Sequence, residues 1–150
     1  MIIGFTGAKR CGKDTAASYI LEQFKQAQQV MLADPIKRGL MEMFGFTWEQ
    51  VNGLNGYDRE QIEVPYGVSI RHMLQTLGTD WGRTFVSPDV WVILQAANLD
   101  PDKLYVMSDV RFPNEAELCR QNGVLIHVEA TEAWSEEADA HESEAGIPFL

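Results

Sequence analysis

The sequence predicts an α/β fold in which helices cover both faces of a parallel β-sheet. Short, continuously apolar segments alternate with helical segments along the chain, a pattern typical of parallel sheets. With 150 residues, 45% of them apolar, the chain is long enough to bury a hydrophobic core. We therefore expect one domain over residues 1–150.

The first strand and helix are expected at either end of a glycine-bounded loop. The apolar run Met1–Phe5 predicts a strand, and residues 15–24 predict a helix. One face of that helix carries Ala16, Tyr19, Ile20 and Phe24.

The loop between them has the spacing of a phosphate-binding loop. It reads Gly7-Ala-Lys-Arg-Cys-Gly-Lys-Asp-Thr15, so that Gly7, Gly12 and Lys13 fit the P-loop pattern. Asp14 stands where the simple pattern has Ser or Thr, and Thr15 follows one position later. Backbone N–H groups, the helix N-terminus and the lysine charge together suit a polyphosphate, so the loop predicts binding of a nucleoside triphosphate. The residues expected to bind it are Gly7, Ala8, Lys9, Arg10, Cys11, Gly12, Lys13, Asp14 and Thr15.

An ordinary strand, turn and helix is the alternative interpretation of the same segment. In both interpretations Cys11 is a small loop residue rather than a redox centre.

The next elements alternate in the same way. Residues 30–33 predict a buried strand, and a helix is expected from there to about Phe44, with Asp34 as N-cap and Pro35 at the first position. Thr47 begins a capping pattern for a short helix, and glycines mark loops at 52–56 and 64–67.

Ser69 is expected to cap a further helix. Its apolar stripe consists of Ile70, Met73, Leu74 and Leu77. Gly78 and a polar stretch to Arg83 predict its end, and another helix is expected from Pro88.

The last predicted elements are a strand at 104–109, a helix at 114–121 and a strand at 124–128. The acidic stretch 129–144 is expected to be an exposed segment.

Ligands of an open parallel sheet bind outside the carboxyl ends of the strands. The loop 7–15, Asp34, Asp109 with Arg111, and the stretch after Val128 all lie at such ends. Asp109 is placed to hold Mg²⁺ beside a triphosphate, directly or through water. A helix or turn cap is its alternative role.

Arg71, Gln75 and Arg83 form a second candidate cluster. Arg71 and Gln75 are four residues apart, so they share a helix face that is not the apolar stripe. Guanidinium groups can grip a phosphate, and an amide can bind a base or sugar. A solvated helix face with surface ion pairs is the alternative.

Charge and cysteine content limit the class of partner and the compartment. The net charge of −10 argues against a polynucleotide, whereas the local basic residues suit small anionic substrates. Cys11 and Cys119 are too far apart in sequence for a disulfide framework, and no segment has the length of a membrane span. We therefore expect an unexported cytoplasmic protein that does not bind a membrane.

Five segments resemble, in order, the deoxynucleoside monophosphate kinases of tailed bacteriophages, a branch of the P-loop nucleoside monophosphate kinases. They are Gly7–Thr15, Ala33-Asp-Pro-Ile-Lys37, Arg71-His-Met-Leu-Gln-Thr-Leu-Gly-Thr-Asp-Trp-Gly-Arg83, Ser108-Asp-Val-Arg-Phe-Pro-Asn-Glu115 and His141-Glu-Ser-Glu144. Together they span nearly the whole chain. The Gly-Lys-Asp-Thr variant also occurs in other P-loop kinases of small metabolites, such as dephospho-coenzyme A kinase.

The resemblance implies a P-loop NTPase fold, a three-layer α/β/α sandwich with a central parallel sheet. It implies a helical monophosphate-binding insertion at about 35–98 and a lid or tail at about 129–150. The implied reaction transfers the γ-phosphoryl group of ATP to a (deoxy)nucleoside monophosphate with Mg²⁺, in phage nucleotide metabolism and so in the host cytoplasm.

The resemblance also implies roles for individual residues. Lys13 holds the β- and γ-phosphates, and Asp14 or Thr15 holds the metal together with Asp109. The acceptor phosphate and the migrating group are clamped by Arg71, Arg83 and Arg111. The nucleoside site is lined by Asp34, Lys37, Gln75 and Trp91, although core packing is an equally good role for Trp91.

Two departures from the family pattern bear on activity. No arginine follows His127, so either the three arginines named above suffice or transfer is slow. The family usually continues past the His141–Glu144 segment with another strand and a final helix, whereas this sequence ends at Leu150. We therefore expect the last core strand to be missing, replaced or supplied by a partner chain.

A shortened sheet edge would favour a homodimer, but the sequence leaves the oligomeric state open. His141 and Glu144 either order a lid or are plain surface residues. The alternative functions are a P-loop kinase of another phosphorylated metabolite and a nucleotide-binding protein that has lost transfer.

Overall fold

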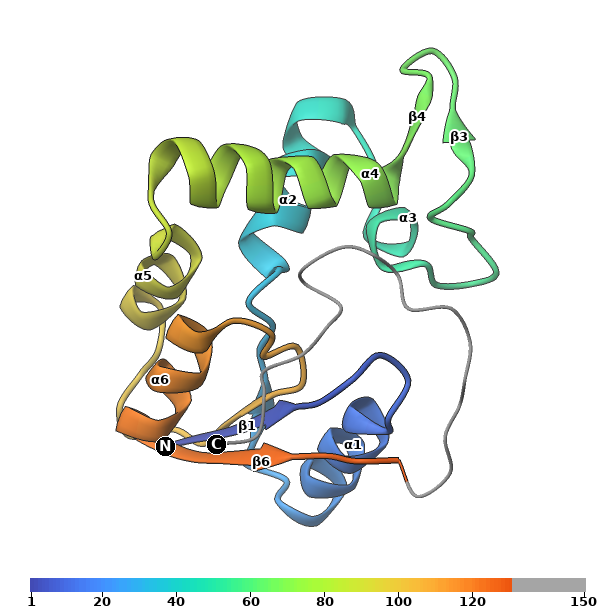
Figure 1. The fold of residues 1–150 in the computed structure, drawn as a ribbon. Coiled ribbons are helices and arrows are strands. Elements are labelled where there is room, and N and C mark those ends of the chain that lie inside the picture. The colour runs from blue at the N-terminus through green and yellow to red at the C-terminus, as the bar shows by residue number, and fades with distance from the viewer. Residues whose placement is uncertain (131–150) are drawn as a thin grey trace. The chain divides into compact units, whose positions relative to one another are not determined.

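The computed structural model describes residues 1–130, and this part of the chain forms two compact units (Figure 1). The sheet unit comprises Met1–Leu32 and the chain from Ala96 onward, and the helical unit comprises Ala33–Gln95. The helical unit occupies nearly the same stretch as the insertion expected at about 35–98. The expected lid, including His141 and Glu144, lies outside the described residues apart from its first two positions.

The sheet unit is built on a four-stranded parallel sheet with the strand order β2-β5-β1-β6. Its strands are β1 (Ile2–Thr6), β2 (Gln28–Gln29), β5 (Tyr105–Met107) and β6 (Gly123–His127). Ile3 of the central strand β1 pairs with Val106 on one side and with Val124 on the other. The predicted parallel α/β fold is confirmed.

Helices cover both faces of this sheet, as expected for the three-layer sandwich. Figure 1 shows α1 (Lys13–Gln23) and α6 (Pro113–Asn122) on opposite sides of the strands. Ala17 of α1 is fully buried against Ile3, Phe5 and Val106. On the other face, a Cβ at Gly4 would lie 2.5 Å from Cys119 Sγ of α6, so Gly4 permits this close helix packing.

Two predicted details of the sheet unit are wrong. The strand expected at 30–33 ends earlier, at Gln29, after which the Val30 N–H still donates to the Val106 carbonyl oxygen. On α1, the predicted apolar face is only half correct. Ala16 and Ile20 pack on the core beside the fully buried Ala17, whereas Tyr19 and Phe24 are exposed.

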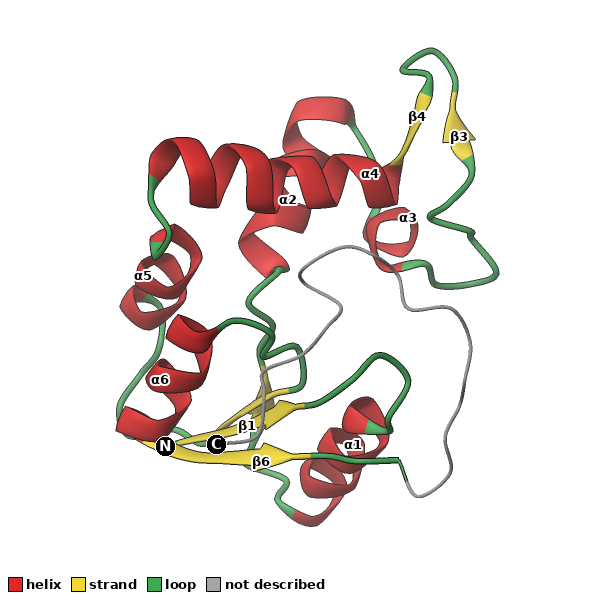
Figure 2. Cartoon of the chain, viewed as in Figure 1, coloured by secondary structure: helices red, strands yellow, loops and turns green. Residues whose placement is uncertain are grey.

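The helical unit contains a short hairpin among its helices (Figure 2). Its elements are α2 (Asp34–Phe44), α3 (Trp48–Asn52), β3 (Ile62–Glu63), β4 (Val68–Ser69), α4 (Ile70–Gln75), the π-helix η1 (Thr76–Val86) and α5 (Val90–Ala97). The hairpin joins β3 and β4 antiparallel and was not predicted. Two-residue strands are too short to give an alternating pattern in the sequence.

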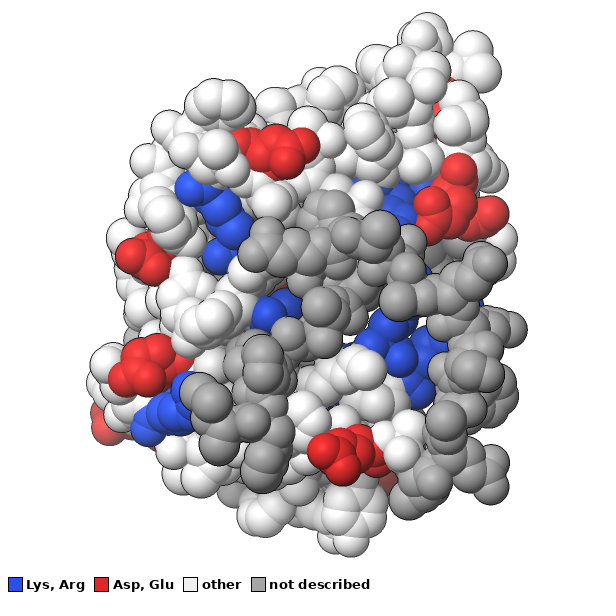
Figure 3. Space-filling model, viewed as in Figure 1, with Lys and Arg blue, Asp and Glu red and all other residues white. Residues whose placement is uncertain are grey.

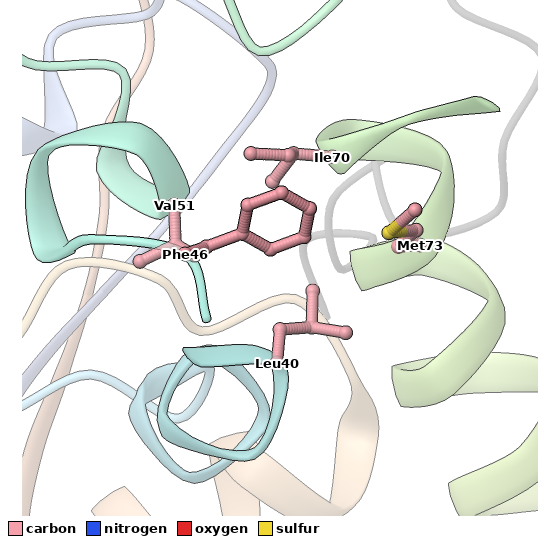
Figure 4. Packing of buried hydrophobic residues seen from close by; sticks show 5 residues of the cluster. All are labelled: Leu40, Phe46, Val51, Ile70 and Met73. Carbon is pink, nitrogen blue, oxygen red and sulfur yellow. The ribbon is translucent and has the colours of Figure 1, made fainter. Parts of the chain in front are cut away.

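One apolar cluster holds the helical unit together (Figure 4). It consists of Leu40, Phe46, Val51, Ile70 and Met73, with Leu74 and Leu77 packed against it. The predicted stripe of the Ser69-capped helix therefore lies in the core. Burial of each such side chain stabilises the fold by about 1.5–3 kcal/mol.

The helix starts were partly predicted. Thr47 and Gln50 form a reciprocal capping box at α3, and the Ser69 hydroxyl accepts from the His72 N–H at 3.2 Å. At α2, however, the N-cap is Ala33. Asp34 is the first helical residue, and its carboxylate lies 3.9 Å from the Lys37 ammonium.

The end predicted at Gly78 is wrong, because α4 continues into η1 as one helical rod (Figure 1). Gly78 and Gly82 are buried, and the indole of Trp91 packs against Gly82. Gly78, which suggested a helix stop, serves here for close packing, because a Cβ there would lie 3.0 Å from Ile36 Cδ1. Across residues 1–130, the helices are too short or too polar to cross a membrane.

Candidate active site

The loop between β1 and α1 is folded by residues in left-handed backbone conformations. Gly7, Arg10 and Gly12 have φ values of 142°, 61° and 100°. Gly12 is also the N-cap of α1, and no side chain caps that helix. The N–H groups in the first turn of α1 form the positive end of the helix dipole, and no side chain at the N-cap accepts a hydrogen bond from them.

The two glycines of the loop are needed for different reasons. A Cβ at Gly7 would lie 2.2 Å from the carbonyl oxygen of Val128, so the chain after β6 passes directly against this residue. A Cβ at Gly12 would have no atom within 4 Å, and only its backbone conformation favours glycine. The loop is therefore fixed both by packing and by its dihedral angles.

Lys13 places its ammonium group against the loop itself. Its Nζ donates to the carbonyl oxygen of Gly7 at 2.9 Å and to that of Ala8 at 2.5 Å, and lies 3.7 Å from Cys11 Sγ. Lys9 and Arg10 are exposed on the same loop, and Asp14 and Thr15 are exposed in the first turn of α1. A positive charge inside a glycine-bounded loop is suited to a polyphosphate.

Asp109 lies two residues beyond the end of β5, the strand next to β1. Asp109 and the loop after β1 therefore both follow the carboxyl ends of neighbouring parallel strands. It is only 9% exposed, and its Oδ1 accepts from the Leu32 N–H at 3.0 Å. The main chain that leaves β2 therefore orients this carboxylate.

Arg111 follows on a turn that a buried carboxylate organises. Glu115 Oε2 accepts from the N–H groups of Arg111 and Phe112 at 2.7 and 3.0 Å. No role was predicted for Glu115, although a glutamate at the third position of a helix is a capping signal. Burial raises the pKa of the Cys119 thiol to about 12, and the negative charges of Glu115 and Asp109 add to this effect.

These donors fit a magnesium ion that arrives with its nucleotide. Within residues 1–130 there is no group of three or more His, Cys, Asp or Glu residues that could hold a metal ion. Mg²⁺ in phosphotransferases needs only one or two carboxylates besides phosphate and water oxygens, and it does not need a complete protein cage. The carboxylates of Asp109 and Asp14 and the hydroxyl of Thr15 are oxygen donors of the kind that Mg²⁺ prefers.

The helical unit carries the other predicted basic residues. On α4, Arg71 Nε lies 3.0 Å from Glu60 Oε1, and Gln75 is partly buried at the end of the same helix. On η1, Arg83 Nη1 donates to the Pro88 carbonyl oxygen at 3.2 Å. Within this unit Arg71 and Arg83 are both partly buried rather than fully solvated.

The remaining predicted residues of the helical unit are buried or paired. Lys37 is 5% exposed, close to Asp34 and 5.9 Å from the centre of the Trp48 ring. Trp91 is also 5% exposed, and its Nε1 donates to the Gly78 carbonyl oxygen at 2.7 Å. Trp91 thus has the core-packing role, and a stacking role on the nucleoside does not fit its burial.

Basic side chains reach the surface despite the acidic net charge. On the face drawn in Figure 3, Lys and Arg side chains are visible beside Asp and Glu side chains. A net charge of −10 therefore leaves room for local sites that bind anions.

Comparison with known proteins decides the family. A family model for deoxynucleotide monophosphate kinase matches residues 1–66 and 62–150. The chain belongs to the deoxynucleotide monophosphate kinase family. The resemblance seen in the five sequence segments is thereby confirmed, and the chain is an ATP-dependent nucleotide kinase, a phosphotransferase.

Individual relatives of the family come from viruses. A protein of Acanthamoeba polyphaga mimivirus is 32% identical over 165 residues, which cover 98% of this chain and 82% of the relative. The deoxynucleoside-5'-monophosphate kinase of Escherichia phage T5 is 39% identical over 90 residues, covering 54% of this chain and 36% of the relative. The deoxynucleotide monophosphate kinase of Escherichia phage RB69 is 28% identical over an alignment of 225 residues, which covers 99% of this chain and 89% of the relative.

Proposed function

We propose that this protein transfers the γ-phosphoryl group of ATP to the 5′-phosphate of a deoxynucleoside monophosphate, giving the diphosphate. The observation that carries the proposal is the position of Lys13. Its ammonium lies within the loop that follows β1, and Asp109 follows the neighbouring strand β5.

On the donor side, Lys13 and the loop amides bind the β- and γ-phosphates. The carbonyl oxygens of Gly7 and Ala8 hold the ammonium at the place where phosphate oxygens of ATP would take over its hydrogen bonds. The uncapped N-terminus of α1 adds its dipole to this attraction. Little covalent chemistry is needed, because positioning and charge neutralisation supply most of the acceleration.

Asp109, with Asp14 or Thr15, would hold Mg²⁺. The ion, when bound, neutralises charge on the β- and γ-phosphate oxygens. The hydrogen bond from Leu32 N–H keeps the Asp109 carboxylate fixed, so this ligand pays little conformational entropy on binding.

On the acceptor side, Arg71, Arg83 and Arg111 are proposed to bind the monophosphate and the migrating group. Glu60 engages Arg71 through Nε, which orients the planar guanidinium fork. Asp34, Lys37 and Gln75 are proposed for the nucleoside. Trp91 is left out because its indole is buried.

The proposed partners are small nucleotides and not polynucleotides, in keeping with the acidic net charge. We place the reaction in the cytoplasm of an infected cell, since the relatives are viral. Among the described residues, β6 lies at an edge of the four-stranded sheet, and pairing of two chains is proposed to use that edge.

The test measures ADP release from ATP and Mg²⁺ with a panel of acceptors: dGMP, dTMP, dCMP, dAMP and their ribose counterparts. Release that rises with one or more deoxynucleoside monophosphates supports the proposal. Stimulation by dephospho-coenzyme A alone would show a different metabolite kinase. ATP binding with no acceptor-dependent release would show a nucleotide-binding protein without transfer.

A further inference from the structure

Two buried hydroxyl groups lie at neighbouring strand ends of the sheet unit. Thr6 ends β1 directly before Gly7 of the loop, and Ser108 follows β5 directly before Asp109. The two residues are 3% and 2% exposed, and neither Oγ atom has a hydrogen-bond partner among the described residues. A buried hydroxyl without a partner destabilises a fold, by about 1–3 kcal/mol, and calls for an explanation.

Thr6 and Asp109 occupy corresponding positions at the ends of two paired strands. In the β1–β5 ladder Gly4 pairs with Met107, and two residues further along both strands are Thr6 and Asp109. Alternation along β1 places Thr6 on the face of Gly4, where Cys119 Sγ packs. The alternation of β5 places Asp109 on the side of Met107, the residue that pairs with Gly4, and therefore on this same face.

Ser108 provides a contrast. Alternation along β5 places it with Val106, on the opposite face that packs against α1. The two hydroxyls are thus equally buried and equally close in sequence to the site, but only Thr6 shares the face of Asp109.

We propose that the Thr6 hydroxyl, together with the Asp109 carboxylate, holds the water shell of the divalent cation that accompanies ATP. Mg²⁺ usually keeps several of its waters when it binds to a protein. A hydroxyl can accept a hydrogen bond from such a water and donate one to another acceptor. Thr6 is then a positioning residue whose hydroxyl gains its partners only with the metal–nucleotide complex. The proposal rests on ATP binding at the loop.

The experiment uses the full chain with Mn²⁺ as the probe and a non-hydrolysable ATP analogue. Free Mn²⁺ is followed by electron paramagnetic resonance, and the melting temperature of the nucleotide-free protein is measured in parallel. Thr6→Val removes the hydroxyl with little change in shape. We expect it to weaken Mn²⁺ binding in the nucleotide complex about tenfold, the equivalent of one hydrogen bond within a charged network. It should also raise the melting temperature of the free protein by about 2–4 °C.

Two variants keep the test specific. Thr6→Ser retains the hydroxyl and should bind Mn²⁺ within about twofold of the original protein, as expected when the hydrogen-bonding group is kept. Ser108→Ala should raise the melting temperature similarly but leave Mn²⁺ affinity unchanged. Unchanged Mn²⁺ affinity in Thr6→Val, or an equal loss in Ser108→Ala, would overturn the proposal. The experiment contains no nucleoside monophosphate, so the measured Mn²⁺ affinity does not depend on whether the protein transfers phosphate to such an acceptor.

Discussion

Trp91 Nε1 donates to the carbonyl oxygen of Gly78 at 2.7 Å, and the same indole packs against Gly82. The contact fixes α5 against the π-helix η1 within the helical unit. π-Helical turns are rare and are frequent at functional sites, but here the indole is buried and bonded to the main chain of η1. The relationship makes Trp91 a structural residue.

We expect Trp91→Phe to lower stability by about 1–3 kcal/mol, because the Gly78 carbonyl oxygen loses its buried donor. The KM for the monophosphate should stay unchanged. Trp81→Phe is the matched control, since Trp81 is 50% exposed and its replacement should hardly change the melting temperature. A large rise in the KM of Trp91→Phe at unchanged stability would restore the nucleoside-binding role.

Gly82→Ala should destabilise the protein. Its Cβ would lie 2.4 Å from the Trp91 ring, and overpacking of this kind costs about 1–3 kcal/mol. Gly39→Ala is the control, because its nearest contacts of 3.9 Å are ordinary and alanine favours the helix interior by about 0.5–1 kcal/mol. Urea unfolding of both variants checks the pair. Equal stability of the two would contradict the packing at Gly82.

Arg71→Gln is expected to raise the KM for the acceptor about tenfold and to leave the KM for ATP nearly unchanged. The reason is the loss of charge-assisted hydrogen bonds to the acceptor phosphate. Arg38→Gln, which removes an exposed arginine of α2, controls for net charge and should change neither value. Equal losses for both substrates in Arg71→Gln would remove this residue from the acceptor site.

Cys119 should make stability fall in alkaline solution. Burial raises the pKa of its thiol to about 12, with Glu115 and Asp109 contributing. The thiol of the unfolded chain loses its proton at lower pH than the thiol of the folded protein. The contribution of Cys119 to the free energy of unfolding is therefore complete below the ordinary thiol pKa of 9.0 and is lost as pH rises through the folded value. One proton corresponds to a slope of about −1.4 kcal/mol per pH unit in between.

Urea unfolding between pH 8 and 11, compared with Cys119→Ala, isolates this effect from other titrating groups. The variant starts less stable, because it leaves a cavity beside Gly4, but its free energy of unfolding should fall less steeply with pH. Parallel curves for the two proteins would show that Cys119 does not titrate in this way.

Much of this architecture could be predicted from local sequence. The apolar runs identified β1, β5 and β6, and the caps at Thr47 and Ser69 identified two helix starts, because each depends on residues close together in the chain. The glycine-bounded loop between β1 and α1 was predicted for the same reason. The backbone conformation of Gly12 and the hydrogen bonds of Lys13 depend on residues of the loop itself.

Features set by distant contacts could not be predicted. β2 consists of Gln28 and Gln29 because an edge strand tolerates polar residues, so the apolar run beside it was misleading. Where α4 continues past Gly78, the Gly78 carbonyl oxygen accepts from Trp91, thirteen residues away, and Arg71 is paired with Glu60. Nor does sequence alone distinguish a buried tryptophan from one that stacks on a ligand.

The central claim is that Lys13 and its loop deliver the γ-phosphoryl group of ATP to a deoxynucleoside monophosphate. The most direct measurement follows ³²P from [γ-³²P]ATP and Mg²⁺ in the presence of each monophosphate, for the original protein and for Lys13→Ala. We predict label in the deoxynucleoside diphosphate with the original protein and its loss in the variant. The account would be contradicted if, with every acceptor, the label stayed in ATP or appeared only as free phosphate. Equal transfer by Lys13→Ala would contradict it as well.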